Sequence, residues 1–358
     1  MAATKEEART ARDAKLDELH ERLTGAVETL VSGEDWARAL EFAARFRSRS
    51  FNNTLLIWVQ HEAAFEAGRV PNPVPSYVAG YRQWQQLGRQ VQKGQPGYMI
   101  FAPVTGRFAS SNPADPSSWR RLGPREKHKV HEVVRTRMVG ARPAYVWDVT
   151  QTEGDPIPET PAPKLLDGEA PAGLWDGLAE QVEALGFEVV RVSDAGQIGG
   201  ADGLTDFRTR QVSVRTDVTE VNQVATLVHE LAHALMHDPK DEEARQHRGI
   251  REVEAESVAL MIGAAHGLDT SRYTIPYVAG WASSVKDTEP AEVIKATGER
   301  VRKTALGILD QLDTFQVPNG TPPSLTRDAP VSEASSRSAA PLPERQPTSA
   351  PAPAGRGL

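Results

Sequence analysis

The pentapeptide His229-Glu230-Leu231-Ala232-His233 has the residue types and the spacing of a hydrolytic metal site. On a helix, residues four apart lie on one face, so the two imidazoles can bind a single metal ion. Glu230 lies between them and is placed to accept a proton from an attacking water. Because the chain has no cysteine, any metal must be held by histidine or carboxylate side chains. The motif therefore predicts a Zn²⁺ site with Glu230 as general base.

The motif lies in an apolar run, Val221 to Leu235, whose large side chains recur at helical spacing. This pattern predicts an amphipathic helix that packs on a core and presents the histidines on a neighbouring face. We expect this helix to begin at Asp217, because Asp217 and Glu220 have the spacing of a capping box. The same spacing at Ser32 and Asp35 predicts the start of an earlier helix.

A catalytic zinc ion generally has three protein ligands, so a third ligand is expected from another segment. The run Arg251 to Gly263 is predicted to be a helix whose second half is apolar on all sides. A carboxylate buried on such a helix needs a partner, and a cation would serve. Glu252 and Glu256 are therefore the candidates for the third ligand, with ordinary paired carboxylates as the alternative, whereas Glu254 is expected to point elsewhere and to form a salt bridge with a nearby arginine.

The remaining patterns predict an α+β protein. One helix is expected to end near residue 30 and a second to begin at residue 32, and further helices are expected over 55–64, 81–87 and 174–185. Strands are expected over 98–104, 130–139, 145–150, 188–192, 204–207 and 211–215. Residues 105–126 are polar and predict an exposed excursion of a hairpin. The strand 211–215 precedes the metal helix, and we expect it to bind an extended peptide by strand addition.

Composition and charge divide the chain. We predict an N-terminal domain over 1–155, a proline-rich linker over 156–172, a second domain over 173–315, and a disordered tail over 316–358. Residues 36–142 hold 17 Lys and Arg against 6 Asp and Glu, whereas residues 156–358 hold 19 against 30. This asymmetry favours a polyanionic partner for the first half, with a solvated basic surface as the alternative.

The N-terminal residues are charged and lack the apolar segment of a secretory signal. Nowhere does the sequence contain an apolar stretch long enough to span a bilayer. A cytoplasmic protein without a membrane partner is the expectation.

The second half resembles known metallopeptidases. Glu252 follows His233 by 19 positions and Glu256 lies one helical turn later, an arrangement that resembles the gluzincin branch. The resemblance implies that Glu252 binds the metal and that Glu256 orients a ligand histidine. The block Glu252-x-Glu254-Ala255-Glu256 also resembles the ImmA/IrrE-like zincin metallopeptidases, although these have Asp or Asn at the last position. Tyr273 and Tyr277 are candidate oxyanion donors, with core packing as the alternative.

The first half resembles the N-terminal domain of ArdC-type antirestriction proteins. The resemblance is carried by Ser50 to Ile57, by Trp84 to Gly97 with its W-x-x-x-G-x-x-V-x-K-G pattern, and by Tyr145 to Gly154. It implies binding of single-stranded DNA, with phosphate contacts and base stacking as the expected modes. The candidate DNA contacts are Arg45, Arg47, Arg49, Phe51, Asn53, Tyr81, Trp84 and Lys93, with Arg120, Arg121, Lys127 and Lys129 as further phosphate contacts.

Three functions fit these patterns. The first is a zinc metallopeptidase joined to a single-stranded DNA-binding domain. The second is a DNA-binding antirestriction or DNA-protection protein with a structural or vestigial zinc site. The third is a regulatory protease that cleaves a repressor. The general base Glu230 favours a catalytic site, because a purely structural zinc ion does not need one.

Overall fold

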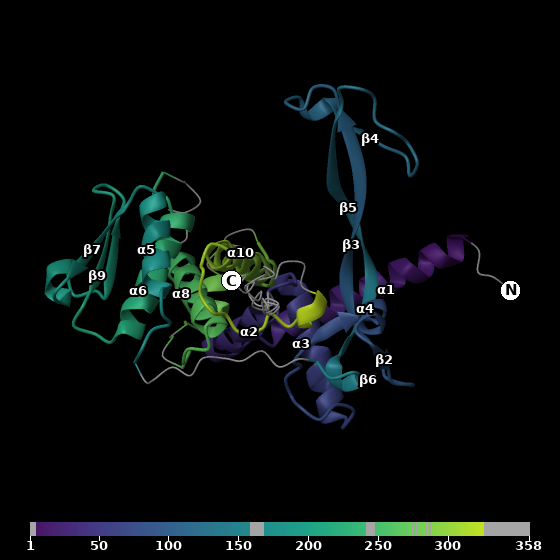
Figure 1. Cartoon of the computed structure of the whole chain (residues 1–358), viewed down its shortest axis with the longest axis horizontal. Helices are drawn as coiled ribbons and strands as arrows, with labels where there is room; N and C mark the ends of the chain where they lie inside the picture. The colour runs from purple at the N-terminus through teal and green to yellow at the C-terminus, as the bar shows by residue number, and fades with distance from the viewer. Residues whose placement is uncertain are drawn as a thin grey trace, which may run out of the picture. The chain divides into compact units, whose positions relative to one another are not determined.

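The computed structural model describes residues 5–157, 168–240 and 248–325, apart from residues 272, 274, 277, 284, 286 and 287. In this part the chain is α+β, as predicted (Figure 1). Residues up to Leu325 form one compact unit, and its hydrophobic core takes side chains from both halves of the chain. Among the described helices, none is long and apolar enough to cross a membrane. Residues 158–167 of the predicted linker and residues 326–358 of the predicted tail lie outside the described residues.

The N-terminal half combines four helices with a four-stranded antiparallel sheet of order β1-β5-β3-β4 and a small β2-β6 pair. Its elements are α1 (Lys5–Glu28), α2 (Gly33–Arg45), α3 (Phe51–Glu66), β1 (Val78–Gly80), α4 (Tyr81–Gln86), β2 (Arg89–Val91), β3 (Tyr98–Ser110), β4 (Arg120–Arg121), β5 (Val133–Asp148) and β6 (Thr152–Gly154). The strands predicted over 130–139 and 145–150 form the single strand β5, followed by a 3-10 turn over 149–151.

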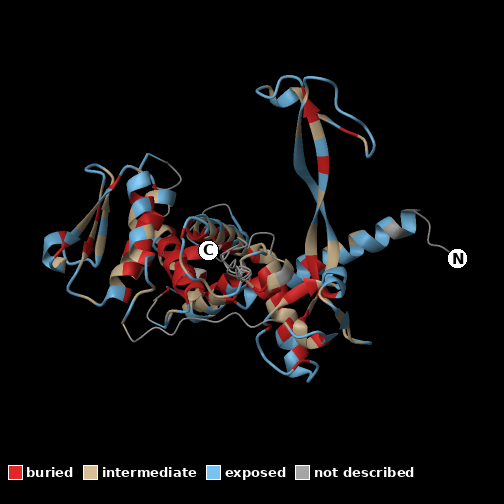
Figure 2. Ribbon diagram, viewed as in Figure 1, coloured by how far each residue is buried: buried red, intermediate tan, exposed pale blue. Residues whose placement is uncertain are grey.

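Strands β3 and β5 pair from Tyr98 opposite Val146 to Ser110 opposite Val133, with a bulge between Val104 and Thr105. Strand β1 pairs with β5 only at the base of this ladder. Beyond the base the two strands run on as a long ribbon, and residues 135–142 are all exposed (Figure 2). We call residues 102–142, with the connection that carries β4, the ribbon arm. Two unsupported strands are marginal alone, so the base of the arm must be well anchored.

Two side-chain amides of α3 anchor that base. The Asn53 Nδ2 donates to the Phe101 carbonyl at 2.8 Å, and the Phe101 N–H donates to Asn53 Oδ1 at 2.9 Å. Similarly, the Gln60 Nε2 donates to the Met99 carbonyl at 3.0 Å, and the Met99 N–H donates to Gln60 Oε1 at 2.9 Å. Each amide therefore satisfies both backbone groups of one β3 residue, as a neighbouring strand would.

Helix α2 begins where the sequence predicts. The Ser32 N–H donates to Asp35 Oδ2 at 2.9 Å, and the Asp35 N–H donates to Ser32 Oγ at 3.1 Å, which completes the capping box. Trp36 is fully buried, and its indole N–H donates to Ser257 Oγ at 2.8 Å. Because Ser257 belongs to the second half of the chain, the two halves share a buried hydrogen bond.

The second half contains α5 (Leu174–Ala184), β7 (Glu188–Val192), β8 (Gly203–Asp206), β9 (Gln211–Arg215), α6 (Glu220–Met236), α8 (Arg248–Ala265), α9 (Val278–Ala282) and α10 (Pro290–Leu309). The strands predicted over 204–207 and 211–215 are β8 and β9, which pair as an antiparallel hairpin, and β7 pairs with β9 in parallel. The sheet order is β7-β9-β8, so both edges of β9 are already paired. The expectation that the strand 211–215 binds a peptide by strand addition is therefore wrong, because the edge strands of this sheet are β7 and β8.

Helix α6 begins three residues later than predicted. Its first residue is Glu220 and its N-cap is Thr219. Asp217 does not cap the helix, because both of its carboxylate oxygens bind the Arg215 guanidinium at 2.7 Å. A bidentate ion pair with Arg is a stronger use of this carboxylate than a single backbone contact.

Residues 316–325, which the composition assigned to the tail, are tied to the compact unit. The Val317 N–H donates to the Ala265 carbonyl at 2.8 Å, and the Val78 N–H donates to the Gly320 carbonyl at 2.9 Å. A short 3-10 turn, Pro323–Leu325, follows.

Candidate metal centre

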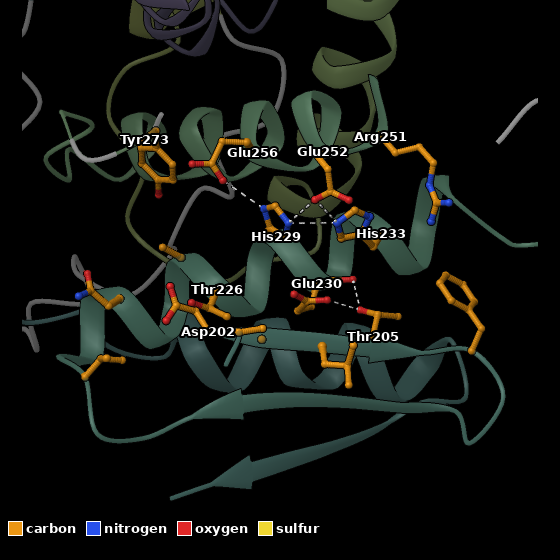
Figure 3. Close-up of a pocket in the computed structure, with 17 residues that line it drawn as sticks. Asp202, Thr205, Thr226, His229, Glu230, His233, Arg251, Glu252, Glu256 and Tyr273 are labelled. Carbon is orange, nitrogen blue, oxygen red and sulfur yellow. Dashed lines mark hydrogen bonds and ion pairs between the residues drawn. The ribbon is translucent and has the colours of Figure 1, made fainter. Parts of the chain in front are cut away.

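Helices α6 and α8 pack together and bring three ligand atoms to one point (Figure 3). The Nε2 atoms of His229 and His233 lie 3.0 Å apart. The Glu252 Oε2 lies 3.6 Å from the Nε2 of His229 and 3.4 Å from that of His233. Among the described residues, this trio is the group of His and carboxylate side chains close enough to hold one metal ion.

The Nδ1 atom of each histidine has its own partner. The His229 Nδ1 lies 3.1 Å from Glu256 Oε2, and the His233 Nδ1 lies 2.9 Å from the Nδ1 of His237. A partner that accepts a proton from Nδ1 leaves the lone pair on Nε2, where a metal can use it. The surroundings thus select the tautomer that both imidazoles need as ligands.

The electrostatics of the trio favour a bound cation. The neighbouring imidazoles of His229 and His233 lower the pKa of Glu252, so its carboxylate is ionised at neutral pH. Burial alone would lower the pKa of His229, but the carboxylates of Glu252 and Glu256 outweigh it and raise that pKa to about 9. A proton on His229 therefore offsets the negative charge of the two acids.

This raised pKa predicts how metal affinity depends on pH. Below about 9 His229 carries a proton that a metal must displace, so affinity should fall by up to roughly tenfold for each pH unit below 9. Zinc titrations in competition with a chromophoric chelator, between pH 7 and pH 9, measure this slope. An affinity that stays constant over that range would contradict it.

Behind His233 lies a chain of polar side chains in which His237 and Glu254 are buried. The expected salt bridge of Glu254 with an arginine is confirmed by its pair with Arg300, whereas the contact between His237 and Glu254 was not predicted. The His237 Nε2 lies 3.0 Å from Glu254 Oε2, and the Arg300 Nε donates to Glu254 Oε1 at 2.7 Å. His237 is 2 % exposed and does not line the cleft. Burial lowers the pKa of His237 in spite of Glu254, so the ring is neutral and can accept from the His233 Nδ1–H while donating to Glu254. The signal for it was His237, four residues after His233 on the same helix face.

Replacing His237 with alanine should weaken zinc binding by roughly 10–100-fold, because His233 then loses the group that fixes its ring. His266→Ala is a matched control. That histidine is also buried, but it bonds the Ile262 carbonyl and Thr314 Oγ1, both at 2.8 Å. The control should destabilise the fold and leave zinc affinity unchanged. Equal zinc affinities for His237→Ala and wild type would show that this ring does not support the site.

Glu230 lines the same cleft as the trio, and its side chain points toward Thr205 of β8 (Figure 3). Its side chain is 6 % exposed, and the Thr205 Oγ1 on β8 donates to its Oε2 at 2.6 Å. Gly203 permits this approach, because a Cβ there would lie 2.5 Å from Thr226 Cγ2 and 2.8 Å from Glu230 Oε1. The cleft has a volume of about 1000 Å³ and is bounded by β8 on one side and by α6 and α8 on the other. A carboxylate is thus held at the floor of an open cleft, beside the metal ligands.

Two further groups line this cleft at opposite ends (Figure 3). Tyr273, a predicted oxyanion donor, lies beside Glu256. Arg251 lies beside Glu252, and its buried Nε has no hydrogen-bond partner among the described residues. Tyr277, the other predicted donor, lies outside the described residues.

The structure places half of the predicted DNA contacts in structural roles. Phe51 and Trp84 are fully buried, so neither is available to stack a base. Arg47 donates to the Ala44 and Val317 carbonyls, and burial lowers its pKa to about 10. Arg49 donates to the Val78 carbonyl, and Asn53 anchors β3. The exposed members of the set are Arg45, Tyr81, Lys93, Arg121, Lys127 and Lys129, while Arg120 is paired with Glu126 and Glu132.

Comparison with known proteins gives two family matches. Residues 14–147 match the N-terminal domain of the anti-restriction factor ArdC, and residues 182–275 match the IrrE N-terminal-like domain of the M78 peptidases. An uncharacterised protein of Bacillus anthracis is 25% identical over 308 residues, which are 81% of this chain. The chain spans about half the length of that relative.

Two crystal structures of the antirestriction protein ArdC from plasmid R388 are also similar. The metal-free structure is 19% identical, with a TM-score of 0.42, and covers 74% of this chain and 84% of its own. The Mn(II)-bound structure is 20% identical, with a TM-score of 0.43, and the match covers 75% of this chain and 86% of the R388 chain. By its two family matches, the chain joins the N-terminal domain of the ArdC anti-restriction family to an IrrE N-terminal-like domain.

Proposed function

We propose that the protein is a zinc-dependent metallopeptidase whose N-terminal half binds single-stranded DNA. His229, His233 and Glu252 hold the metal, and Glu230 is the general base for peptide-bond hydrolysis. The convergence of two Nε2 atoms and one carboxylate oxygen beside a buried carboxylate, in an open cleft, is the observation that supports hydrolysis. The match to a peptidase family agrees with it.

The residues present fit a zinc ion. Zinc bonds of about 2.0–2.2 Å in tetrahedral geometry separate neighbouring ligand atoms by roughly 3.3 Å. The three separations in the trio are 3.0, 3.4 and 3.6 Å. Two histidines and a carboxylate are a common ligand set of catalytic zinc, and they also suit manganese. Three protein ligands facing a cleft leave a fourth position open, which favours a catalytic site over a structural one.

When bound, zinc would polarise the scissile carbonyl and acidify the attacking water. Glu230 accepts the proton of that water and delivers it to the leaving amine. Thr205 holds Oε2 of this carboxylate and so leaves Oε1 for the proton transfer. Tyr273 lines the same cleft and is proposed to donate to the oxyanion, and Glu256 keeps the ring of His229 in place.

Strand β8 is the proposed docking edge for the peptide. It is an edge strand of its sheet, and residues 201–205 line the cleft. An extended peptide added along β8 would satisfy the unpaired backbone groups of this edge and lie across the metal ligands.

The test is peptide hydrolysis by the full chain with and without metal. The protein is stripped with a chelator and then given Zn²⁺ or Mn²⁺, and a degenerate peptide library is followed by mass spectrometry. We expect no cleavage by the stripped protein and restored cleavage with Zn²⁺. Cleavage that survives complete metal removal would refute the mechanism, and a zinc-loaded protein that cleaves nothing, with or without an oligonucleotide, would refute the activity.

A further inference from the structure

The ribbon arm concentrates positive charge in a chain whose net charge is −7. Residues 105–142 hold nine Lys and Arg against three Asp and Glu. Two of the acids, Glu126 and Glu132, bind the single cation Arg120. The third, Asp115, caps the turn at Ser117. The other eight cations of the segment form no salt bridge with any residue that the structure describes, so their charge is left for a partner.

Part of this charge is gathered on one face of the arm. In an antiparallel ladder, directly opposed residues lie on the same face. Phe108 is opposite Arg135 of β5 and also opposite Arg121 of β4, and Gly106 is opposite Arg137. These three arginines, with Phe108 and Trp119, make up what we call the arginine face.

Aromatic rings hold two of these arginines in place. The guanidinium carbons of Arg135 and Arg137 lie 4.9 Å and 4.8 Å from the Trp119 ring centroid, and that of Arg137 lies 5.7 Å from the Phe108 centroid. This interaction uses the ring face and leaves the guanidinium N–H donors free for another acceptor. Because the guanidinium groups are already ordered, less conformational entropy is lost when they bind a ligand.

Gly106 makes room for this arrangement. A Cβ at this position would lie 3.2 Å from Arg121 Nε and 3.1 Å from Val139 Cγ1, which is tighter than ordinary contact. The missing side chain lets Arg121 lie over the middle of the face. On β5, residues 135–142 are all exposed (Figure 2), so Arg135 and Arg137 are accessible to a bound chain.

We propose that the arginine face is the surface that binds single-stranded DNA, by its phosphates; this inference rests on the DNA binding proposed above. Planar guanidinium groups match phosphate oxygens, and a basic surface with aromatic side chains is the usual composition of a single-strand binding site. Arg135 and Arg137 are two residues apart on a strand, about 6.8 Å, a spacing suited to neighbouring phosphates of an extended strand. Contacts of this kind position the backbone without reading its sequence.

The test compares two triple variants of the full chain that carry the same charge change. One replaces Arg121, Arg135 and Arg137 with glutamine; the control replaces the exposed cations Arg82, Arg208 and Lys303 with glutamine. Binding of fluorescent dT30 is measured by anisotropy at several salt concentrations. At about 0.1 M salt the arm variant should lose roughly 100-fold in affinity, and its slope of log K against log salt should shrink by about 2, whereas the control should change by less than about threefold.

The outcomes separate this inference from the function on which it rests. Wild type that binds dT30 while the arm variant loses no more than the control would overturn the arginine face and leave DNA binding standing. Wild type that binds no dT30 would overturn both. Wild type that binds a 30-base-pair duplex at least as tightly as dT30 would overturn the single-strand assignment.

A second variant guards against misfolding of the first. Trp119→Leu keeps every charge and removes the ring that orders the two arginines. Its affinity for dT30 should fall roughly two- to fivefold with an unchanged salt slope. An affinity equal to that of wild type would contradict the role of the ring, and zinc affinity checks that each variant is folded.

Discussion

Glu230→Gln should lower the rate of peptide hydrolysis by roughly 10²- to 10⁴-fold and leave zinc affinity close to that of wild type. Glutamine has the size of glutamate and can still accept the hydrogen bond from Thr205, so the cleft keeps its shape. It cannot take a proton from the attacking water. Initial rates on the best library peptide, with zinc content measured on the same samples, give both quantities.

Two further variants test whether this effect is specific to Glu230. Glu220→Gln changes the same residue type in the exposed first turn of α6 and should leave the rate unchanged. Thr205→Val keeps the charge of Glu230 but removes the hydroxyl that holds it, so its rate should fall between those of wild type and Glu230→Gln. A Glu230→Gln protein that hydrolyses peptide as fast as wild type would exclude this residue as the base.

The second large effect is on zinc binding itself. His233→Ala should weaken zinc affinity by roughly 10³-fold or more, beyond the 10- to 100-fold typical of groups that only support a ligand. Of the three ligand side chains His233 is the most buried, and it contacts both other ligands and His237. Saturating zinc should raise the free energy of unfolding of wild type by about 4 kcal/mol at a thousandfold excess over its Kd, and this gain should vanish in the variant. Chelator competition and thermal unfolding measure the two effects.

The three acids of α8 provide an internal comparison for that experiment. Glu252→Gln should come close to the loss of His233→Ala, since Glu252 Oε2 is the third converging atom. Glu254→Gln and Glu256→Gln should each cost only about 10- to 100-fold, because these acids contact His237 and His229 and not the metal position. A full zinc affinity in Glu252→Gln, with a large loss in Glu256→Gln, would move the third ligand to Glu256.

Local patterns predicted the parts of the site that lie within one element. The spacing of His229 and His233 on a helix, and the capping box of Ser32 and Asp35, depend on residues a single turn apart, and these patterns are visible in one sequence. The contact between His237 and Glu254 joins two helices, so only packing could reveal it. Asp217 had the spacing of a cap but found a stronger partner in Arg215, which the capping pattern does not take into account.

The first half was harder to read for a related reason. Arg47, Arg49 and Asn53 have the polar character of ligand contacts, yet the fold uses them to satisfy backbone carbonyls and strand edges. The ribbon arm shows the opposite case. Residues 135–142 of β5 are all exposed, so the alternation of apolar and polar residues that marks a half-buried strand is weak there, and β5 was predicted as two shorter strands.

The side-chain amides of Asn53 and Gln60 that bind β3 also affect how readily the protein aggregates. The outer edge of a long strand carries open backbone donors and acceptors, and such an edge readily recruits another strand and starts aggregation. At Met99 and Phe101 those groups are already occupied by Gln60 and Asn53. At these two residues, a strand of a second molecule therefore has no open backbone group with which to pair. Farther out, repulsion between the cations of two arms opposes their association. The same side chains that anchor the ribbon thus also protect the edge of its base against pairing with another strand.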